Sequence, residues 1–278
     1  MLDLLAAGLR EVTVRPFTGP RLDLDAFLEA MLRSRVSRRV LAEHHIGLAS
    51  PRPGHVGAVC AAVDLADAVH HAAARTRQAC VEAYGVAPSV VVDAPAAPAI
   101  PHIPAHVDYC LHELLKNAAR ATVEAALRRA GTRTVPPTAL PPVRVRVCDA
   151  PGDGGAATLV VSDEGGGVPD GDLGRVWRFG FTTVPADGLG GGGDPLAAAS
   201  AGGGDARYRL AGLGFGLPLS RLYARYFGGD LRLVSLRGHG VDAFLTLPHL
   251  VGDWVEAGGD DVVGGRGGGA GRGGAALP

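Results

Sequence analysis

The sequence is short of lysine and asparagine, each of which occurs once, at Lys116 and Asn117. Its 278 residues instead include 42 glycines and 20 prolines, with many Ala and Arg, as a GC-rich coding sequence would give. Such a bias removes Lys and Asn almost everywhere. Their occurrence side by side therefore singles out residues 112–118, His-Glu-Leu-Leu-Lys-Asn-Ala, as the segment to explain.

Cysteine is also scarce, and its spacing excludes several classes of site. The chain has four cysteines, far apart and without a Cys-x-x-Cys pair, at Cys60, Cys80, Cys110 and Cys148. This spacing argues against a zinc site or a disulfide framework, and it predicts buried thiols in a reducing compartment.

Long hydrophobic runs and charge blocks are missing as well. No run of about 18 uncharged apolar residues occurs, so no transmembrane helix is expected. The first residues lack the basic start of a targeting segment, so no targeting signal is expected in this chain. The net charge is -1 and the arginines are spread along the chain. This charge pattern indicates neither a nucleic-acid nor an anionic-membrane partner.

Residues 105–130 are predicted to form an amphipathic helix around the Lys-Asn pair. At 100° per residue one face is polar and carries Glu113, Lys116, Asn117, Arg120 and Glu124. The opposite face is apolar and carries Leu111, Leu114, Leu115, Ala118 and Ala125. One face is suited to a core and the other to polar chemistry.

The rest of the chain alternates helix and strand patterns after a Pro/Gly boundary at residues 50–54. An amphipathic helix is predicted before this boundary, over residues 23–48, and its apolar stripe must pack on a partner. Further predicted helices cover residues 65–84 and a segment ending at 227. Predicted strands cover residues 89–92, 143–147, 158–162, 230–235 and 242–247, and the second and third are expected to pair antiparallel. This order predicts an α+β fold, and a hydrophobic content of 47% is ample for its core.

Two glycine-rich motifs flank a Gly/Ala-rich stretch at residues 188–204 that we expect to be a mobile loop. Residues 163–169, Asp-Glu-Gly-Gly-Gly-Val-Pro, follow a strand, where a carboxylate can accept a hydrogen bond from adenine and glycines can approach a flat ring. Residues 212–218, Gly-Leu-Gly-Phe-Gly-Leu-Pro, open a helix and offer backbone N–H groups to phosphate. In a chain with 42 glycines, each motif alone is weak evidence for a binding site. Their order after the polar helix face is far more specific.

Together these residues resemble the ATP-binding fold shared by gyrase, heat-shock chaperone, histidine kinase and MutL proteins. Within it, the chain is similar to the mitochondrial kinases of the 2-oxo acid dehydrogenase complexes. The likeness lies in residues 34–41, 112–122, 163–169, 181–183 and 210–233. It implies a two-layer α/β sandwich, with a mixed sheet covered by helices on one face. Residues 1–50 would be the remnant of a helical bundle, residues 51–250 the catalytic domain with its lid at 188–204, and residues 251–278 a disordered tail.

The resemblance also implies roles for individual residues. Glu113 would be the general base, and Asn117 would ligate Mg²⁺, which bridges the ATP phosphates, while K⁺ is a further possible cofactor. Lys116 and Arg120 would steady phosphate charge, and Asp163 would bind the adenine amino group beside Gly165 and Gly167. The remaining nucleotide-binding residues would be Thr182, Thr183, Gly212, Leu213, Gly214, Phe215, Gly216 and Leu217.

The function implied is a protein serine kinase that inactivates the decarboxylase subunit of a 2-oxo acid dehydrogenase complex, with pyruvate or branched-chain specificity left open. The implied setting is a homodimer in the mitochondrial matrix that also binds the lipoyl domain of the acyltransferase core, without nucleic-acid or membrane partners. Two features depart from the family. Val241 stands where a threonine normally contributes to the adenine pocket, and the shortened bundle is expected to leave the lipoyl site incomplete.

Two alternatives remain open at this point. One is a non-catalytic nucleotide-binding or dimerisation module. The other is a sensor histidine kinase, with His44 or His45 as phosphoacceptor, although a packing or surface pair is the commoner role of such histidines.

Overall fold

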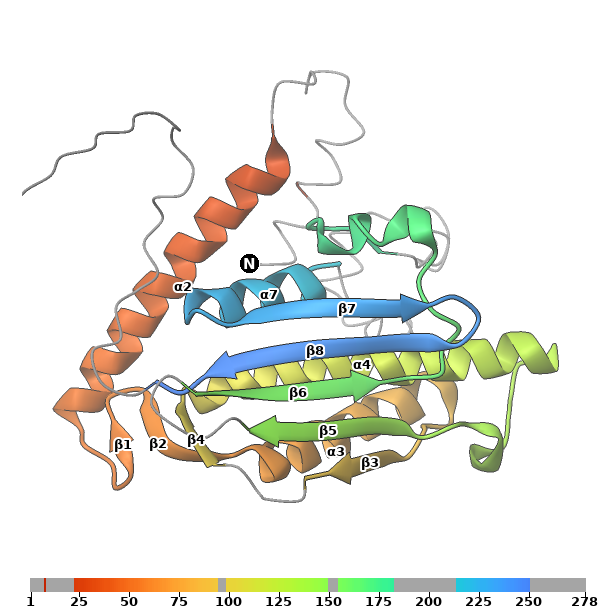
Figure 1. The fold of residues 1–278 in the computed structure, drawn as a ribbon, viewed down its shortest axis with the longest axis horizontal. Helices are drawn as coiled ribbons and strands as arrows, with labels where there is room; N and C mark the ends of the chain where they lie inside the picture. Colours follow the sequence, from red (N-terminus) through yellow and green to blue (C-terminus); the bar gives the residue numbers. More distant parts are fainter. Residues whose placement is uncertain (1–7, 9–22, 95–98, 150–154, 183–213, 251–278) are drawn as a thin grey trace, which may run out of the picture.

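The computed structural model describes residues 8, 23–94, 99–149, 155–182 and 214–250. At its centre lies a five-stranded mixed sheet in the order β3-β5-β6-β8-β7 (Figure 1). Its strands are β3 (Val90–Asp93), β5 (Val143–Asp149), β6 (Ala156–Ser162), β7 (Asp230–Leu236) and β8 (Gly240–Pro248). Strands β3 and β5 are parallel and the other neighbours are antiparallel. The predicted antiparallel pairing of β5 with β6 is confirmed.

Three helices cover one face of this sheet (Figure 1): α3 (Leu65–Tyr84), α4 (Pro104–Ala130) and α7 (Gly216–Tyr226). Along β6 every second residue, from Ala157 to Val161, is buried against the helices, while the residues between them are half-buried. Alternation of this kind places one side of a strand in the core and the other outside it. The predicted α+β sandwich with helices on one face is confirmed.

Helix α4 is the central helix of this layer. It begins with Pro104, whose missing N–H would have no partner in a first turn, and it ends at Gly131, whose φ of 61° lies in the left-handed region. The predicted apolar face is confirmed, since all five of its residues are buried: Leu111, Leu114, Leu115, Ala118 and Ala125. The opposite face is thereby turned away from the sheet.

Helix α2 (Leu24–Ala49) packs against α7 through one stripe, formed by Leu28, Leu32, Val36 and Val40. Asp23 caps its N-terminus, and Asp25 pairs with Arg178 at 2.8 Å. The partner that the stripe requires is therefore found in α7. The division between a bundle remnant at 1–50 and a domain at 51–250 remains a prediction, and the predicted lid (188–204) and tail (251–278) lie outside the described residues.

A smaller sheet was not predicted. It consists of β1 (His55–Val56), β2 (Val59–Asp64) and β4 (Ala99–His102), in the order β1-β2-β4. Strand β4 contains Pro101, which disfavours a strand in sequence, but a proline is tolerated on an edge strand such as this one. Three short 3-10 helices complete the described elements: η1 (Pro137–Ala139), η2 (Asp170–Asp172) and η3 (Arg175–Trp177).

The expectation that all four cysteines are buried is wrong for Cys148 and only partly met by Cys60. Cys80 and Cys110 are buried, Cys60 is half-buried and Cys148 is exposed. The reason for Cys148 is the alternation of β5, which turns Val147 into the core and the next side chain outward. Within the described residues, no helix has the length and apolarity needed to cross a bilayer.

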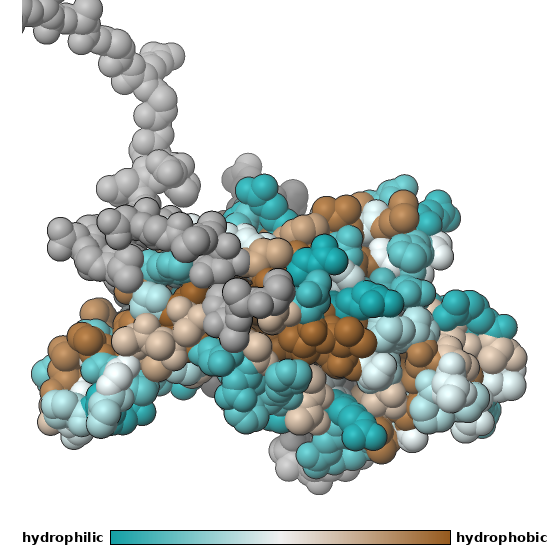
Figure 2. Space-filling view, turned by 60° about the horizontal axis from the view of Figure 1, so that its bottom comes forward, coloured by the Kyte–Doolittle hydropathy of each residue, from teal (hydrophilic) through white to brown (hydrophobic). Residues whose placement is uncertain are grey.

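Several large hydrophobic side chains remain exposed in the described part of the chain. Figure 2 shows hydrophobic residues grouped between hydrophilic ones on the surface that it views. On α2 the exposed hydrophobic residues are Phe27, Leu41, Ile46 and Leu48, and on the sheet they include Val91, Val234 and Leu236. The helix-free side of β7 is thus partly apolar.

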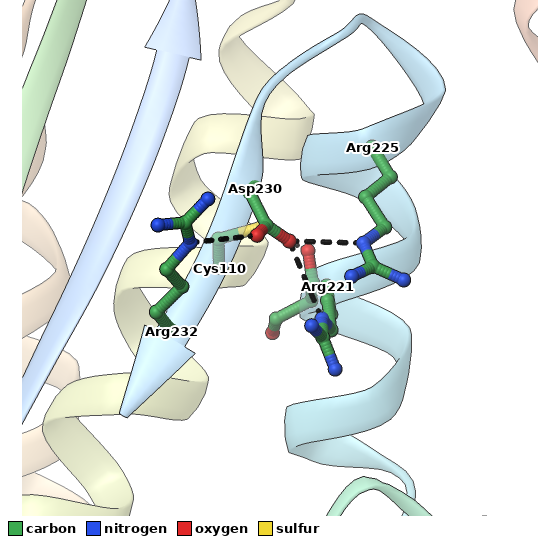
Figure 3. A network of polar contacts seen from close by, with 6 residues as sticks. Cys110, Arg221, Arg225, Asp230 and Arg232 are labelled. Carbon is green, nitrogen blue, oxygen red and sulfur yellow. Dashed lines mark hydrogen bonds and ion pairs between the residues drawn. The ribbon is translucent and has the colours of Figure 1, made fainter. Parts of the chain in front are cut away.

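A cluster of charged side chains ties the end of α7 to the start of β7 (Figure 3). Asp230 accepts hydrogen bonds from Arg225 at 2.9 Å, Arg232 at 3.1 Å and Arg221 at 3.3 Å. Partial burial alone would raise the pKa of Asp230, but these three hydrogen bonds together outweigh it and lower the pKa to about 2. The Cys110 thiol also donates to the Ser220 carbonyl, which joins α4 to α7.

Candidate functional site

The polar face of α4 carries one tight ion pair. The Lys116 ammonium donates to Glu113 Oε1 at 2.6 Å, and the two side chains are only 11% and 14% exposed. Both residues lie on the polar face because they are three apart in a helix, where side chains meet. The single lysine of the chain is therefore bonded to the predicted general base.

Asn117 and Arg120 continue this face without partners in the described part of the chain. The Asn117 side chain is half-buried and forms no hydrogen bond with any described residue. Arg120 Nε and Nη1 are buried and have no hydrogen-bond partner among the same residues. Buried polar groups are normally paired, so these two side chains are suited to a ligand.

Glu124, one helical turn after Arg120, has a structural partner instead. Its carboxylate accepts a hydrogen bond of 2.7 Å from the Tyr84 hydroxyl on α3. Burial, with this hydrogen bond added, raises the pKa of Tyr84, so the phenol stays protonated. The polar face of α4 therefore ends at a hydrogen bond to α3. The part of this face that is available to a candidate ligand runs from Glu113 to Arg120.

The loop after β6 folds tightly against α4. Gly165 N–H donates to Asp163 Oδ1 at 2.8 Å, and a Cβ on Gly165 would collide with the Ala121 side chain of α4. Gly167 has a φ of 78°, and its backbone lies against Leu236. Both glycines thus permit contacts that a side chain would block. The loop is held beside the turn of α4 that follows Asn117.

Asp163 is the most perturbed carboxyl group of this loop. Burial is the main cause that raises its pKa to about 6, and the hydrogen bonds from Gly165 and at Val241 only partly oppose it. Its backbone N–H donates to the Val241 carbonyl at 3.0 Å, so Val241 is its neighbour on β8. The carboxylate is thus half-buried, next to a valine whose side chain cannot form the hydrogen bonds of a threonine.

The N-terminus of α7 meets α4 at Glu113. A Cβ on Gly216, the first residue of α7, would collide with Glu113 Oε2. Phe215 is buried against Phe179, with ring centroids 5.7 Å apart, and Leu217 is partly buried against the core. The predicted phosphate loop therefore reaches the predicted base.

Residues 180–182 lie beside the start of this loop. Gly180 N–H donates to the Gly214 carbonyl at 3.0 Å, and Gly214, with a φ of 77°, packs against the Phe181 carbonyl. Thr182 follows directly and is half-buried. The other three predicted site residues, Thr183, Gly212 and Leu213, lie outside the described residues.

The three parts of the site line up along α4. Gly216 lies at Glu113, Gly165 lies at Ala121, and Asn117 is midway between them. Eight residues of helix span about 12 Å at 1.5 Å per residue. A half-buried carboxylate at one end can hold the adenine, and a half-buried carboxamide in the middle can hold a metal-bound phosphate chain. The helix N-terminus at the other end can hold the last phosphate.

Two contributors to this geometry were missed. Ser235 Oγ accepts from Val168 N–H at 2.7 Å and fixes the end of the glycine loop, and Ala121 supplies the surface on which Gly165 packs. No signal in the sequence joins Ser235 to Val168, because they are 67 residues apart. Ala121 could have been found from its place one turn after Asn117.

His44, near the end of α2, packs against the turn between β1 and β2. Ala58 N–H donates to His44 Nδ1 at 3.3 Å, and the ring lies against Gly57. His45 is exposed on the neighbouring helix position. This contact anchors α2 to the hairpin of β1 and β2, which favours the packing role over a phosphoacceptor.

Comparison with known families gives two matches. Residues 103–251 match the family model of histidine kinase-, DNA gyrase B- and HSP90-like ATPases. Residues 1–60 match the model described as mitochondrial branched-chain alpha-ketoacid dehydrogenase kinase. The first match contains every described site residue, from Glu113 on α4 to Leu217 on α7.

Similar curated proteins are named as mitochondrial pyruvate dehydrogenase (acetyl-transferring) kinases. The Arabidopsis thaliana protein is 32% identical over 253 residues, which cover 90% of this chain and 64% of that protein. The Schizosaccharomyces pombe protein is 34% identical, with coverage of 82% and 51%. The Homo sapiens isozyme 3 is 34% identical, with coverage of 84% and 55%. The chain thus spans between about half and two thirds of the length of these relatives.

Proposed function

Because the chain belongs to the histidine kinase-, DNA gyrase B- and HSP90-like ATPase family, and within it to the mitochondrial 2-oxo acid dehydrogenase kinases, we propose that it is an ATP-dependent protein serine kinase. Its substrate would be the decarboxylase subunit of a 2-oxo acid dehydrogenase complex. Phosphorylation would inactivate that subunit by adding negative charge at its active site. The observation that carries this proposal is the arrangement along α4. Glu113 lies against Gly216, Gly165 of the Asp163 loop lies against the other end of the same stretch of helix, and Asn117 lies between them.

In the proposed reaction Glu113 removes the proton of a substrate serine hydroxyl. The serine oxygen forms a bond to the γ-phosphorus as the bond to the ADP bridging oxygen breaks, and the proton goes to the Glu113 carboxylate. Asp163 accepts a hydrogen bond from the adenine amino group. The N-terminus of α7 and Arg120 supply positive charge to the phosphates. Each of these groups would thus act on the nucleotide or the substrate from its own position along α4 or next to it.

A magnesium ion fits this site through Asn117. Among the described residues no three His, Cys, Asp or Glu side chains lie together as a metal site. A bound ion would therefore take the Asn117 amide oxygen and phosphate oxygens as ligands, as Mg²⁺ in nucleotide sites commonly does. When bound, the ion supplies charge neutralisation to the phosphate chain. K⁺ is proposed as a further cofactor, on family resemblance alone.

Phosphate transfer to purified decarboxylase tests the proposal. We expect Glu113→Gln to lower kcat by about 10²- to 10⁴-fold without weakening nucleotide binding, because general-base catalysis contributes about that factor. Asn117→Ala should raise the Mg²⁺ concentration needed for half-maximal transfer and lower the transfer rate as well. Glu124→Gln is the matched control on the same helix face, since its partner is Tyr84. Equal transfer by all variants would refute these roles.

A second candidate is a non-catalytic nucleotide-binding module. Val241 favours it, because a valine beside Asp163 cannot donate or accept the side-chain hydrogen bonds of the threonine that it replaces. Calorimetric binding of ATP without transfer to either decarboxylase would support this module over the kinase. Val241→Thr should then restore affinity without restoring transfer.

A homodimer is proposed through the helix-free face of the sheet. Val234 and Leu236 on β7 are 57% and 63% exposed there, and apolar side chains in such a place suit an interface. Sedimentation velocity of Val234→Asp and Leu236→Asp should show monomers. Leu41→Asp, 64% exposed on α2, is the control and should stay dimeric. Dimers of all three variants would contradict this face.

The specific complex, the lipoyl partner and the location are proposed from the relatives. The named pyruvate dehydrogenase kinases favour pyruvate dehydrogenase, while the model matched by residues 1–60 is named for the branched-chain enzyme. Side-by-side transfer to the two purified decarboxylases would decide between them. Binding to lipoylated and unlipoylated lipoyl domains would test that partner. The mitochondrial matrix is the proposed location, because the relatives are named mitochondrial.

A further inference from the structure

The two carboxylate oxygens of Glu113 have different neighbours. Oε1 accepts from the Lys116 ammonium at 2.6 Å. Oε2 lies against Gly216, so that a Cβ there would collide with it and would stand 3.1 Å from the carboxyl carbon. The base is therefore fixed between an ammonium and the first residue of α7.

Two groups that attract anions lie beside the Glu113 carboxylate, namely the Lys116 ammonium and the N-terminus of α7. An ammonium and a helix N-terminus are the groups that proteins use to bind phosphate. Both side chains of the ion pair are nearly buried, so solvent screens their attraction little. Lys116 has no other partner among the described residues. A phosphate that enters beside Gly216 would compete with Glu113 for the same two groups.

We propose that Lys116 is a positioning residue that changes partner when nucleotide binds. Without nucleotide Lys116 holds Glu113 against α7. When the phosphates of ATP arrive, the ammonium turns to them and the Glu113 carboxylate is released toward the substrate hydroxyl. The proposal rests on the kinase function proposed above and adds a coupling between nucleotide binding and the base.

The charges favour such an exchange. A triphosphate carries several negative charges and a carboxylate only one, so the ammonium is attracted more strongly to the nucleotide. The Glu113 oxygen that accepts from the Lys116 ammonium is also not free to accept from a substrate hydroxyl. The exchange thus activates Glu113 only when the phosphate to be transferred is in place.

The single lysine makes the exchange directly measurable. Protein labelled with ¹³C,¹⁵N-lysine gives one side-chain signal, from Lys116. We expect Glu113→Gln to shift this signal in the protein without nucleotide. With Mg²⁺ and adenosine 5′-(β,γ-imido)triphosphate bound, the same substitution should leave the signal almost unchanged, because Lys116 has left Glu113. A merely structural lysine would not show this dependence on nucleotide.

Controls separate this inference from the kinase function. Glu124→Gln should leave the Lys116 signal unchanged in both states, and Glu113→Asp, a second variant with a shorter side chain, should behave as Glu113→Gln does. If the analogue binds by calorimetry and Glu113→Gln shifts the signal equally with and without it, the lysine stays on Glu113 and the exchange is overturned while the kinase proposal stands. If the analogue does not bind, both are overturned.

Discussion

Asp163 and Asp230 are the same residue type in opposite surroundings. Asp163 follows a strand beside α4, is half-buried and has no ion-pair partner among the described residues, and burial raises its pKa to about 6. Asp230 opens a strand at the sheet edge, among three arginines, and its pKa falls to about 2 (Figure 3). The arginines satisfy Asp230 within the fold. Asp163 is left with a carboxylate that a ligand can stabilise, and this difference is the reason for proposing it as a binding residue.

The largest expected effect is on nucleotide affinity. Asp163→Asn should weaken binding of an ATP analogue about 10- to 100-fold, because a hydrogen bond to a charged group contributes about 1.5–3 kcal/mol. Asp230→Asn should leave the affinity unchanged. Calorimetry at pH 7.5 checks both variants, and equal losses would break the distinction between the two aspartates.

Asp163→Asn should also stabilise the protein in the absence of ligand. The folded protein keeps the Asp163 proton up to a pH of about 6, whereas the unfolded chain loses it near 4. Between these values the folded state binds more protons, so its stability falls as pH rises. Asp163→Asn should therefore add about 2 kcal/mol to the free energy of unfolding at pH 8. The gain should vanish near pH 4 in urea denaturation, and a variant less stable than wild type at pH 8 would contradict it.

Nucleotide affinity should depend on pH through the same group. Only the ionised Asp163 carboxylate offers its full acceptor strength to adenine, so affinity should fall as pH drops below about 6. At pH 5 we expect roughly tenfold weaker binding than at pH 7.5, as one unit below a pKa gives. The profile of Asp163→Asn, titrated in parallel, gives the contribution of the phosphates, which can then be subtracted from the wild-type profile. Parallel profiles for both proteins would exclude Asp163 as the cause.

Asp230 should contribute to stability with the opposite sign. Its folded pKa lies below the unfolded value, so its stabilisation is present above pH 4 and is lost as pH falls through about 2. After allowance for solvent screening of the exposed arginines, Asp230→Asn should cost about 1 kcal/mol at pH 7. The cost should shrink in 1 M salt. Thermal unfolding in low and high salt measures it, and a salt-independent cost would point to packing instead.

The smallest expected effects are those of single arginine substitutions on the free energy of unfolding, and they should increase with the burial of the arginine. Arg232 is 78% exposed, so Arg232→Gln should change the free energy of unfolding by less than about 0.5 kcal/mol. Arg221 is 25% exposed and also stacks over Trp177 at 4.3 Å, so Arg221→Gln should cost more, about 1 kcal/mol. Equal costs in the same unfolding assay would show that burial does not set their contributions.

Much of the fold could be predicted because local pattern and packing agree. The apolar face of α4 and the antiparallel pair β5 and β6 follow from periodicity alone. Strand β4 could not be predicted, since Pro101 argues against a strand and only the pairing with β2 makes one. The exposure of Cys148 follows from the alternation of β5, which outweighs the general preference of cysteine for the core.

The candidate site could be predicted in its parts but not in its contacts. Residue types and their order point to Glu113, Asn117 and Asp163. The contact of Gly216 with Glu113 joins residues about a hundred positions apart, and so depends on how α7 packs on α4. The hydrogen bond of Ser235 to the glycine loop likewise arises from strand register. Such long-range contacts leave no trace in a single sequence.

A crystal structure with Mg²⁺ and adenosine 5′-(β,γ-imido)triphosphate tests the central claim most directly. We predict the adenine amino group at Asp163, the metal at Asn117 and the last phosphate beside Gly216. The structure also has a cavity of about 480 Å³ elsewhere, between the end of α2 and the start of α4, lined by residues that include Arg52 and Ile103. Nucleotide in that cavity, or none at saturating concentration, would contradict the account.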